Sequence, residues 1–141
     1  MRVLLLGAPG AGKGTQAKIL ADSIGVPHIA SGDLFRNHQF EGTDLGKLAK
    51  SYMDAGELVP DEVVIQMVLD RIGQTDAEIG YILDGFPRTV PQAEALDEAL
   101  ASQNGVLDRV TLIEVAVEDL TRRLSGRWSC GQCQRPYHEI S

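Results

Sequence analysis

Apolar residues along the chain fall into two kinds of segment, short unbroken runs and longer stretches with helical spacing. The first run, Val3-Leu4-Leu5-Leu6, predicts a buried parallel strand over residues 2–6 that is apolar on both faces. The next stretch repeats apolar side chains every three to four residues and predicts a helix whose apolar face comprises Ala17, Leu20, Ala21 and Ile24. A strand, a turn and a helix therefore open the chain.

Helices dominate the following segment. The run Pro27-His28-Ile29-Ala30 predicts a short second strand, and Ser31 then provides a suitable N-cap for a helix. Two further helices are expected before residue 73, one capped by Thr43 and one begun by Pro60. Residues 31–72 thus contain several short helices with no strand between them, which predicts a helical insert that stands off a sheet.

Strands return in the second half of the chain. The run Tyr81-Ile82-Leu83-Asp84 predicts a strand that ends in a carboxylate, and residues 89–102 predict a helix that tolerates Pro91 in its first turn. A strand is expected over residues 109–115 and a helix over residues 118–124. Strands that alternate with helices favour an α/β fold, in which a parallel sheet carries helices on both faces and binds ligands at the carboxyl ends of its strands.

The turn between the first strand and the first helix reads Gly7-Ala8-Pro9-Gly10-Ala11-Gly12-Lys13-Gly14-Thr15. Glycines let consecutive backbone N–H groups curl around an anion, and the following helix adds the positive end of its dipole. Lys13 adds a full positive charge for the terminal phosphates of a nucleotide. Because a strand precedes this pattern and a helix follows it, the sequence predicts a phosphate-binding loop.

Composition limits the classes of function. The 141 residues make about one domain, with 43% hydrophobic residues, 23% charged residues and a formal net charge of −7. An acidic protein is a poor candidate for binding nucleic acid or anionic membrane through its overall charge. The chain has no apolar run of membrane-spanning length, and its two cysteines do not form a disulfide framework. We therefore expect a cytoplasmic protein that binds neither nucleic acid nor membrane. As a separate expectation, the protein is a monomer whose partners are small molecules.

The residues after Lys13 bear on metal binding. A nucleoside triphosphate is usually bound with Mg²⁺, and common phosphate-binding loops place Ser or Thr directly after the lysine as a metal ligand. Here Gly14 takes that position and Thr15 follows one residue later. We expect Mg²⁺ to be held mostly by phosphates and water molecules, with Asp84 as the partner of those waters. A turn-forming role before Gly85 is the alternative for Asp84.

The phosphoryl acceptor is suggested by arginines. The chain lacks the Asn-Lys-x-Asp pattern by which GTPases read their base, and four arginines lie at the ends of expected elements: Arg36, Arg88, Arg123 and Arg127. Positioned arginines suit the charge that spreads over the oxygens of a transferring phosphoryl group, and an acceptor that is itself a phosphate needs no general base. Taken singly, an arginine is more often a solvated surface charge. The run Asp84-Gly85-Phe86-Pro87-Arg88 makes Arg88 the strongest of the four candidates.

Gln92 follows Arg88 by four residues on the expected helix over residues 89–102. A planar amide offers a donor beside an acceptor, which suits the edge of a purine base. An exposed helical glutamine is the alternative, and it is favoured when Gln92 is considered in isolation.

Cys130 and Cys133 have the spacing of one half of a zinc site. His138 is a candidate third ligand, but the sequence after it supplies no fourth ligand. Half of a Zn²⁺ site and two free thiols therefore stay equally open as interpretations. We interpret His28 and His38 as structural or surface residues.

Three motifs in combination resemble those of bacterial adenylate kinases: Gly7-Ala8-Pro9-Gly10-Ala11-Gly12-Lys13-Gly14-Thr15-Gln16, Ser31-Gly32-Asp33 with Arg36, and Asp84-Gly85-Phe86-Pro87-Arg88-Thr89 with Gln92. The resemblance runs from Met1 to the last residues. It implies reversible transfer of the terminal phosphoryl group from Mg·ATP to AMP, which gives two ADP and balances the adenine nucleotides. It also implies a core domain over 1–30 and 61–126, an AMP-binding helical insert over 31–60 and part of a lid over 127–141.

The resemblance assigns site residues by position. On the ATP side it implies loop residues, two arginines and two lid residues near the adenine, namely Gly10, Ala11, Gly12, Lys13, Gly14, Thr15, Arg123, Arg127, Pro136 and Tyr137. On the AMP side it implies Ser31, Arg36, Glu57, Leu58, Val59, Gly85, Phe86, Pro87, Arg88 and Gln92. Catalytic roles would fall to Lys13, Asp84, Arg88 and Arg127. Cys130 and Cys133 correspond to the first ligand pair of the zinc-bearing lid.

The family continues past the first lid hairpin with a second pair of metal ligands, two further arginines, a final strand and a closing helix. Because the given chain ends at Ser141, inside the lid, we expect either a longer gene product or a lid-truncated form. For the chain as given, two consequences are expected. Weak activity is expected because water exclusion and charge stabilisation are incomplete, and reduced stability because a sheet edge is open. The alternatives are a pyrimidine monophosphate kinase, which Thr89 and Gln92 disfavour, and a non-catalytic nucleotide-binding fragment.

Overall fold

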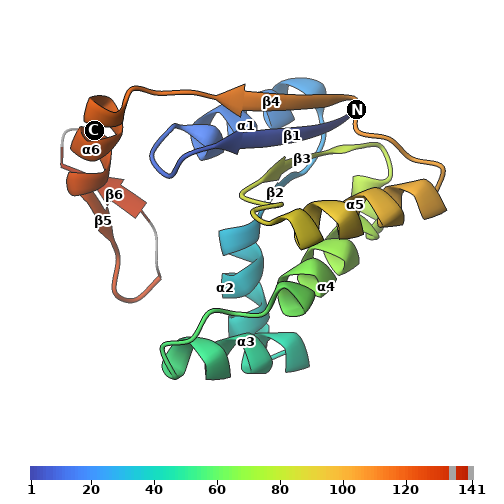
Figure 1. Ribbon diagram of the computed structural model, residues 1–141, viewed down its shortest axis with the longest axis horizontal. Helices are drawn as coiled ribbons and strands as arrows, with labels where there is room; N and C mark the ends of the chain where they lie inside the picture. Colours follow the sequence, from blue (N-terminus) through green and yellow to red (C-terminus); the bar gives the residue numbers. More distant parts are fainter. Residues whose placement is uncertain (134–135, 140–141) are drawn as a thin grey trace.

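A parallel sheet forms the centre of the molecule (Figure 1). The computed structural model describes residues 1–133 and 136–139, and in this part of the chain four strands are arranged in the order β2-β3-β1-β4. They are β1 (Arg2–Gly7), β2 (His28–Ala30), β3 (Tyr81–Asp84) and β4 (Arg109–Ile113). Leu5 lies opposite Asp84 on one side of β1 and Thr111 on the other. The predicted parallel arrangement is confirmed.

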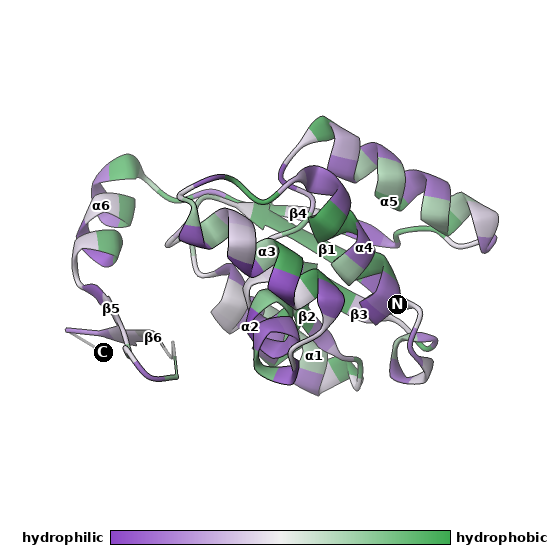
Figure 2. Cartoon of the chain, turned by 90° about the horizontal axis from the view of Figure 1, so that it is seen from below, coloured by the Kyte–Doolittle hydropathy of each residue, from purple (hydrophilic) through white to green (hydrophobic). Residues whose placement is uncertain are grey.

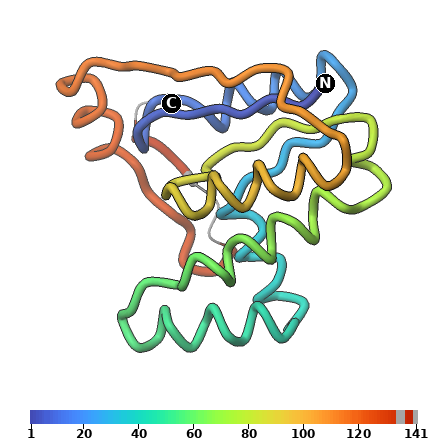
Figure 3. Tube along the Cα trace, turned by 45° about the vertical axis from the view of Figure 1, so that its right-hand side comes forward, coloured from blue at the N-terminus to red at the C-terminus, as the bar shows by residue number. Residues whose placement is uncertain are grey.

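Helices cover both faces of this sheet because alternate side chains of a strand point to opposite faces. Helix α1 (Lys13–Ile24) packs on one face, and α4 (Asp61–Ile72) and α5 (Val90–Ser102) pack on the other (Figures 1 and 3). The core under α1 consists of Val3, Leu5, Ala17, Ala21 and Ile82. The larger core under α4 and α5 includes Leu4, Val68, Tyr81, Leu83, Phe86 and Leu96. The three-layer α/β fold class is therefore confirmed.

Two helices extend from the sheet after β2. They are α2 (Ser31–Glu41) and α3 (Asp44–Asp54), and they meet α4 in a third apolar cluster that contains Ala49, Val63 and Met67. Helix α4 is thus buried on two sides, whereas the spacing of Ile65, Val68, Leu69 and Ile72 predicts one buried face. The second face could not be read from that spacing, because it depends on how α3 packs against α4.

Of the two helix caps predicted in this insert, one is confirmed and the other is wrong. Thr43 caps α3 as predicted, because its Oγ1 accepts a hydrogen bond from the Gly46 N–H at 3.0 Å. Ser31 was predicted as an N-cap, and this detail is wrong. Ala30 is the N-cap, and Ser31 is the first helical residue. The hydroxyl of Ser31 instead donates to the carbonyl oxygen of Gly85 at 2.9 Å.

A 3₁₀ turn (Thr75–Ala77) precedes β3. The segment after β4 lies at the end of the sheet that carries the strand carboxyl termini, and it begins with α6 (Val117–Ser125). Strands β5 (Arg127–Ser129) and β6 (Pro136–His138) form an antiparallel hairpin. No residue of α6 is buried, and Figure 2 shows α6 and the hairpin apart from the body. None of the described helices is long and apolar enough to cross a membrane.

Strand β4 ends two residues earlier than the apolar run predicted. The last residue of β1, Gly7, pairs with Ile113, so residues 114 and 115 have no strand partner in β1. The chain continues without regular structure to α6. Apolar character therefore extends past the point where pairing stops.

Candidate functional site

The glycine-rich loop joins β1 to α1, in the context that its sequence predicted. Gly12 precedes the first helical residue, Lys13, and has a φ of 96°. This left-handed conformation suits glycine because a Cβ there meets the backbone. The Ala11 N–H closes a turn onto the Ala8 carbonyl oxygen at 3.1 Å. The loop is therefore a tight turn at the N-terminus of a helix, where N–H groups and the helix dipole favour an anion.

Two cationic side chains contact this loop. The Lys13 ammonium donates to the carbonyl oxygens of Gly7 at 2.8 Å and Ala8 at 3.1 Å. An ammonium has three N–H donors, so one remains for another acceptor. Arg123, on α6, donates from Nη1 to the Gly10 carbonyl oxygen at 3.2 Å. Residues 113 positions apart in the chain are thus brought together, and the loop lies between two positive charges.

Asp84 lies at the end of β3, directly beside the loop. Its Oδ2 is 3.5 Å from the place where a Cβ on Gly14 would sit, so the absence of a side chain at Gly14 leaves room at the carboxylate. His28 approaches the same carboxylate from β2, with Nε2 at 3.2 Å from Oδ2. The interpretation of His28 as a structural or surface residue did not include this contact, and only the neighbouring positions of β2 and β3 reveal it.

A second cluster starts one residue after Asp84. The Gly85 carbonyl oxygen accepts from Ser31 Oγ at 2.9 Å and from Arg88 Nε at 2.8 Å. Arg88 Nη2 is also 3.4 Å from Ser31 Oγ. Arg88 is exposed, and its guanidinium keeps further N–H donors. Ser31, Gly85 and Arg88 were predicted separately from two motifs, and the fold brings them into one hydrogen-bonded group.

Gln92 is 5% exposed, so the alternative of an exposed helical glutamine is wrong. Its Oε1 accepts from the Arg88 N–H at 2.7 Å, and its Nε2 donates to Asp61 Oδ1 at 2.8 Å. Asp61 is a residue that the sequence interpretation did not consider for the site. It begins α4, and no local pattern connects it with a residue in α5.

The other residues expected on the AMP side differ in position. Phe86 is buried in the core under α4 and α5, and a cis peptide bond joins it to Pro87. Arg36 forms an exposed ion pair with Asp33 on the first turns of α2. Leu58 is 94% exposed, in the segment between α3 and α4. Of these residues, Phe86 has a core environment, whereas Arg36 and Leu58 are exposed.

The hairpin carries the remaining candidates. Arg127 and Tyr137 are exposed in β5 and β6, and the backbone of Pro136 begins β6. The Glu139 N–H donates to the Gly126 carbonyl oxygen at 2.9 Å, which returns the hairpin to the end of α6. Arg127 is therefore attached to the helix that carries Arg123.

Cys130 and Cys133 lie in the turn of this hairpin as free thiols. Hydrogen bonds from the backbone N–H groups of Cys133 and Gln132, and from the Cys133 thiol, lower the pKa of Cys130 from its ordinary value. His138, the candidate third ligand, has Nε2 at 2.9 Å from the Arg123 carbonyl oxygen. In the part of the chain that the structure describes, no three Cys, His, Asp or Glu side chains form a group suited to a metal ion.

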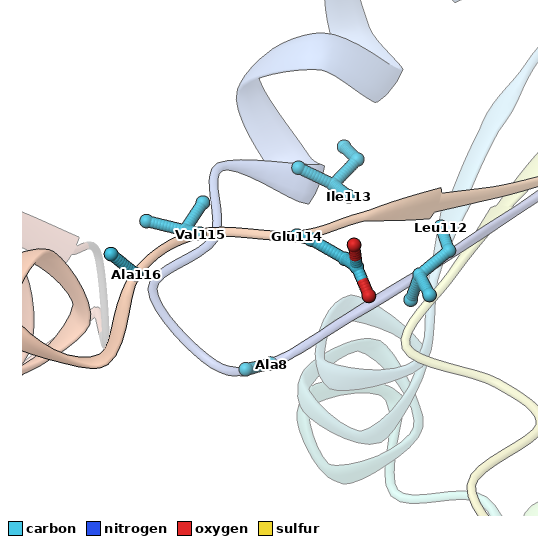
Figure 4. A pocket seen from close by; sticks show the side chains of 6 residues that line it. All are labelled: Ala8, Leu112, Ile113, Glu114, Val115 and Ala116. Atoms are coloured by element: carbon cyan, nitrogen blue, oxygen red, sulfur yellow. The ribbon is translucent and has the colours of Figure 1, made fainter.

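An open hollow of about 460 Å³ lies beside the loop, between Ala8 and the segment that leads from β4 to α6 (Figure 4). Its lining consists of Ala8, Leu112, Ile113, Glu114, Val115 and Ala116. Figure 4 shows Glu114 and Ile113 pointing to opposite sides of the segment. The sequence interpretation did not assign this segment to the site, because its apolar run reads as strand.

Comparison with known proteins agrees with this geometry. The family model described as adenylate kinase matches residues 5–136. An adenylate kinase of Ruminiclostridium cellulolyticum is 53% identical over 99% of this chain, and one of Methanocella arvoryzae is 55% identical over 99% of it. The chain spans 65% of the length of each of these curated relatives. Because the match covers nearly the whole chain and the motif residues meet at one end of the sheet, the chain belongs to the adenylate kinase family.

Proposed function

We propose that this site transfers the terminal phosphoryl group of Mg·ATP to AMP and gives two molecules of ADP. One observation carries the proposal: Asp84 faces the phosphate-binding loop, and the next residue, Gly85, holds the Ser31–Arg88 cluster. Two anion-binding groups therefore meet at the end of one strand. A site for two phosphorylated substrates needs this arrangement, since donor and acceptor phosphates must be held in line.

The donor side is supported by the loop and its cations. The N–H groups of residues 10–15 and the third N–H of Lys13 would bind the ATP phosphates. Arg123, already held at Gly10, would add charge at the same phosphates, and Arg127 and Tyr137 on the attached hairpin would approach from the same end. These residues would act by positioning and by charge stabilisation, which are the main contributions in phosphoryl transfer.

The residues present fit a magnesium ion bound mostly through water. Asp84 is 12% exposed in its side chain, and the space over Gly14 is open to it. Mg²⁺ usually keeps several waters and takes one or two carboxylates plus substrate phosphates. When bound with ATP, Mg²⁺ would neutralise charge on the phosphates. Asp84 would accept hydrogen bonds from its waters, and His28 would hold the carboxylate in place.

The acceptor side is supported by Ser31, Arg88 and Gln92. Arg88 would bind the AMP phosphate with the N–H groups that Gly85 and Ser31 do not use, because a guanidinium pairs with phosphate in two-point contacts. The AMP phosphate is already an anion, so it attacks without a general base. Gln92 would face the adenine edge, and the backbone of Glu57, Leu58 and Val59 would line the same side.

The proposal divides the chain into a core over 1–30 and 61–126, an AMP-binding insert over 31–60 and a cover segment over 127–141. The separate apolar cluster among α2, α3 and α4 supports the insert. The hairpin lies apart from the body, which supports the cover segment. Residues 134–135 and 140–141 of this segment lie outside the described residues.

We propose a zinc role for Cys130 and Cys133 only as one pair of a larger ligand set, because structural zinc takes four ligands. The lowered pKa of Cys130 supports this role, since zinc binds thiolates. Alkylation by iodoacetamide tests it. Micromolar Zn²⁺ that slows modification of both thiols supports the role, and equal rates with Zn²⁺ or a chelator contradict it.

A coupled assay tests the main proposal by following ADP formed from ATP and AMP. Formation of two ADP per AMP, dependent on Mg²⁺, is the expected result. Faster turnover of CMP or UMP than of AMP would favour a pyrimidine monophosphate kinase instead. Calorimetric binding of ATP without any ADP formation would favour a nucleotide-binding fragment.

A further inference from the structure

Asp61 joins the first turns of two helices that are separate in the sequence. Its Oδ1 accepts from Gln92 Nε2 at 2.8 Å, and its Oδ2 accepts from Thr89 Oγ1 at 3.0 Å. Thr89 is the N-cap of α5, and its Oγ1 accepts in turn from the Gln92 N–H at 3.3 Å. One carboxylate therefore holds the capping residue and the buried amide together.

These contacts determine which way the Gln92 amide faces. A carboxylate only accepts hydrogen bonds, so the amide must turn its NH₂ group toward Asp61. The backbone N–H of Arg88 only donates, so the amide must turn Oε1 toward Arg88. Both partners favour the same orientation. A flipped amide would lose both hydrogen bonds, at a residue that is only 5% exposed.

The two contacts leave part of the amide unused. A primary amide has two N–H donors and two acceptor lone pairs. Asp61 and Arg88 take one donor and one lone pair, so one of each remains, and the fixed orientation of the amide determines which of its ends donates and which accepts. The adenine edge offers an amino donor beside a ring-nitrogen acceptor. Hypoxanthine offers the reverse order, an oxo acceptor beside a ring N–H donor.

We propose that Asp61 is a positioning residue for base selection: by fixing the orientation of the Gln92 amide, it makes the acceptor site prefer a 6-amino purine monophosphate to its 6-oxo analogue. The inference rests on the proposed function, because it takes the AMP side of the site as given. Asp61 acts through Gln92 and does not itself contact the base. Its position in the first turn of α4 suits a carboxylate, because that end of the helix is positive.

Calorimetry with AMP and with inosine 5′-monophosphate, without ATP, tests the inference. We expect Asp61→Leu to lower the ratio of the AMP affinity to the inosine 5′-monophosphate affinity about tenfold, mainly by weakening the binding of AMP. Glu62→Leu is the matched control, because Glu62 is an exposed carboxylate in the same first turn of α4. It should leave the ratio within about twofold. A purely structural role of Asp61 would weaken both nucleotides equally, and an unchanged ratio therefore overturns the proposal.

A double-mutant cycle identifies the route of the effect. In a Gln92→Leu background, Asp61→Leu should change the ratio no further, because the amide on which it acts is absent. A further tenfold loss in that background would overturn the proposal. Thermal melting checks that the variants fold. Should Asp61→Leu not fold, Asp61→Asn replaces it, with an expected loss of about threefold because one acceptor oxygen remains, and an unchanged ratio again counts against the proposal.

The measurement also separates this inference from the proposed function. A wild-type chain that binds AMP more tightly than the inosine analogue, but forms no ADP, contradicts the phosphoryl transfer and leaves base selection to be decided by the variants. A wild-type chain with no preference between the two nucleotides contradicts the inference whatever its activity.

Discussion

His28 Nε2 lies 3.2 Å from Asp84 Oδ2, so a residue of β2 holds the carboxylate that ends β3. Because the carboxylate accepts, the imidazole proton resides on Nε2 in this contact. The side chains are 22% and 12% exposed, so the pair is shielded but not sealed from water. The same Oδ2 is 3.5 Å from the place where a Cβ on Gly14 would sit, so the carboxylate that His28 contacts faces the loop, where a hydrated metal ion is proposed.

The first prediction concerns this pair. His28→Leu removes the donor and should raise the Mg²⁺ concentration needed for half-maximal ADP formation about tenfold, because a hydrogen bond to a charged group contributes about 1.5–3 kcal/mol. His28→Gln keeps an N–H at similar reach and should recover most of the loss. The measurement is a Mg²⁺ titration at fixed ATP and AMP. Wild-type Mg²⁺ dependence in His28→Leu would show that Asp84 needs no support from β2.

The second prediction concerns the loop lysine. Lys13→Met removes the charge proposed at the ATP phosphates, and kcat should fall roughly a hundredfold to a thousandfold, as when one transition-state donor is lost. Lys18→Met is the control, because Lys18 is an exposed cation on the same helix and should have little effect. Equal losses in the two variants would mean that general charge, and not contact with phosphate, accounts for the effect.

The sequence predicted those elements whose signals are local. Thr43 caps its helix as the pattern indicated, and Asp84 ends its strand where expected. The contact of His28 with Asp84 was not predictable, because strand order depends on how distant segments pack. The bond from Gln92 to Asp61 was missed for the same reason. Periodicity identifies a buried face of a helix, but it does not identify the residue that will face it.

The third prediction concerns Tyr81, a core residue that is 2% exposed. Of the buried side-chain N and O atoms in the described residues, the Tyr81 hydroxyl is the one without a hydrogen-bond partner. Tyr81→Phe should therefore leave the free energy of unfolding at pH 7 unchanged or raise it by up to about 1 kcal/mol, because an unpaired buried hydroxyl is unfavourable. Denaturant unfolding measures this. A clear loss of stability would indicate that the hydroxyl has a partner in solution.

The same residue gives a pH prediction. Burial raises the pKa of Tyr81 above its ordinary value of 10.0, and the charge of Arg2 opposes this rise. A group with a raised pKa in the folded state contributes stability below the unfolded pKa and loses it as pH rises through the folded pKa. The unfolding free energy of the wild type should therefore fall relative to that of Tyr81→Phe as pH rises above about 10. Parallel curves for the two proteins would contradict this reading.

The fourth prediction concerns Gly85, which connects the two halves of the proposed site. Its φ is 79°, and a Cβ there would lie 2.7 Å from Ser31 Oγ and 3.2 Å from Arg88 Nη2. Gly85→Ala should displace both side chains and raise the KM for AMP about tenfold or more, with a much smaller change in the KM for ATP. Gly42→Ala is the control, since Gly42 has a φ of 66° but nothing within 4 Å of the added Cβ. It carries the same backbone strain of about 1–2 kcal/mol without the collision. Equal effects of the two substitutions on AMP would assign the loss to strain, whereas a loss confined to Gly85→Ala places the acceptor phosphate at the Ser31–Arg88 cluster.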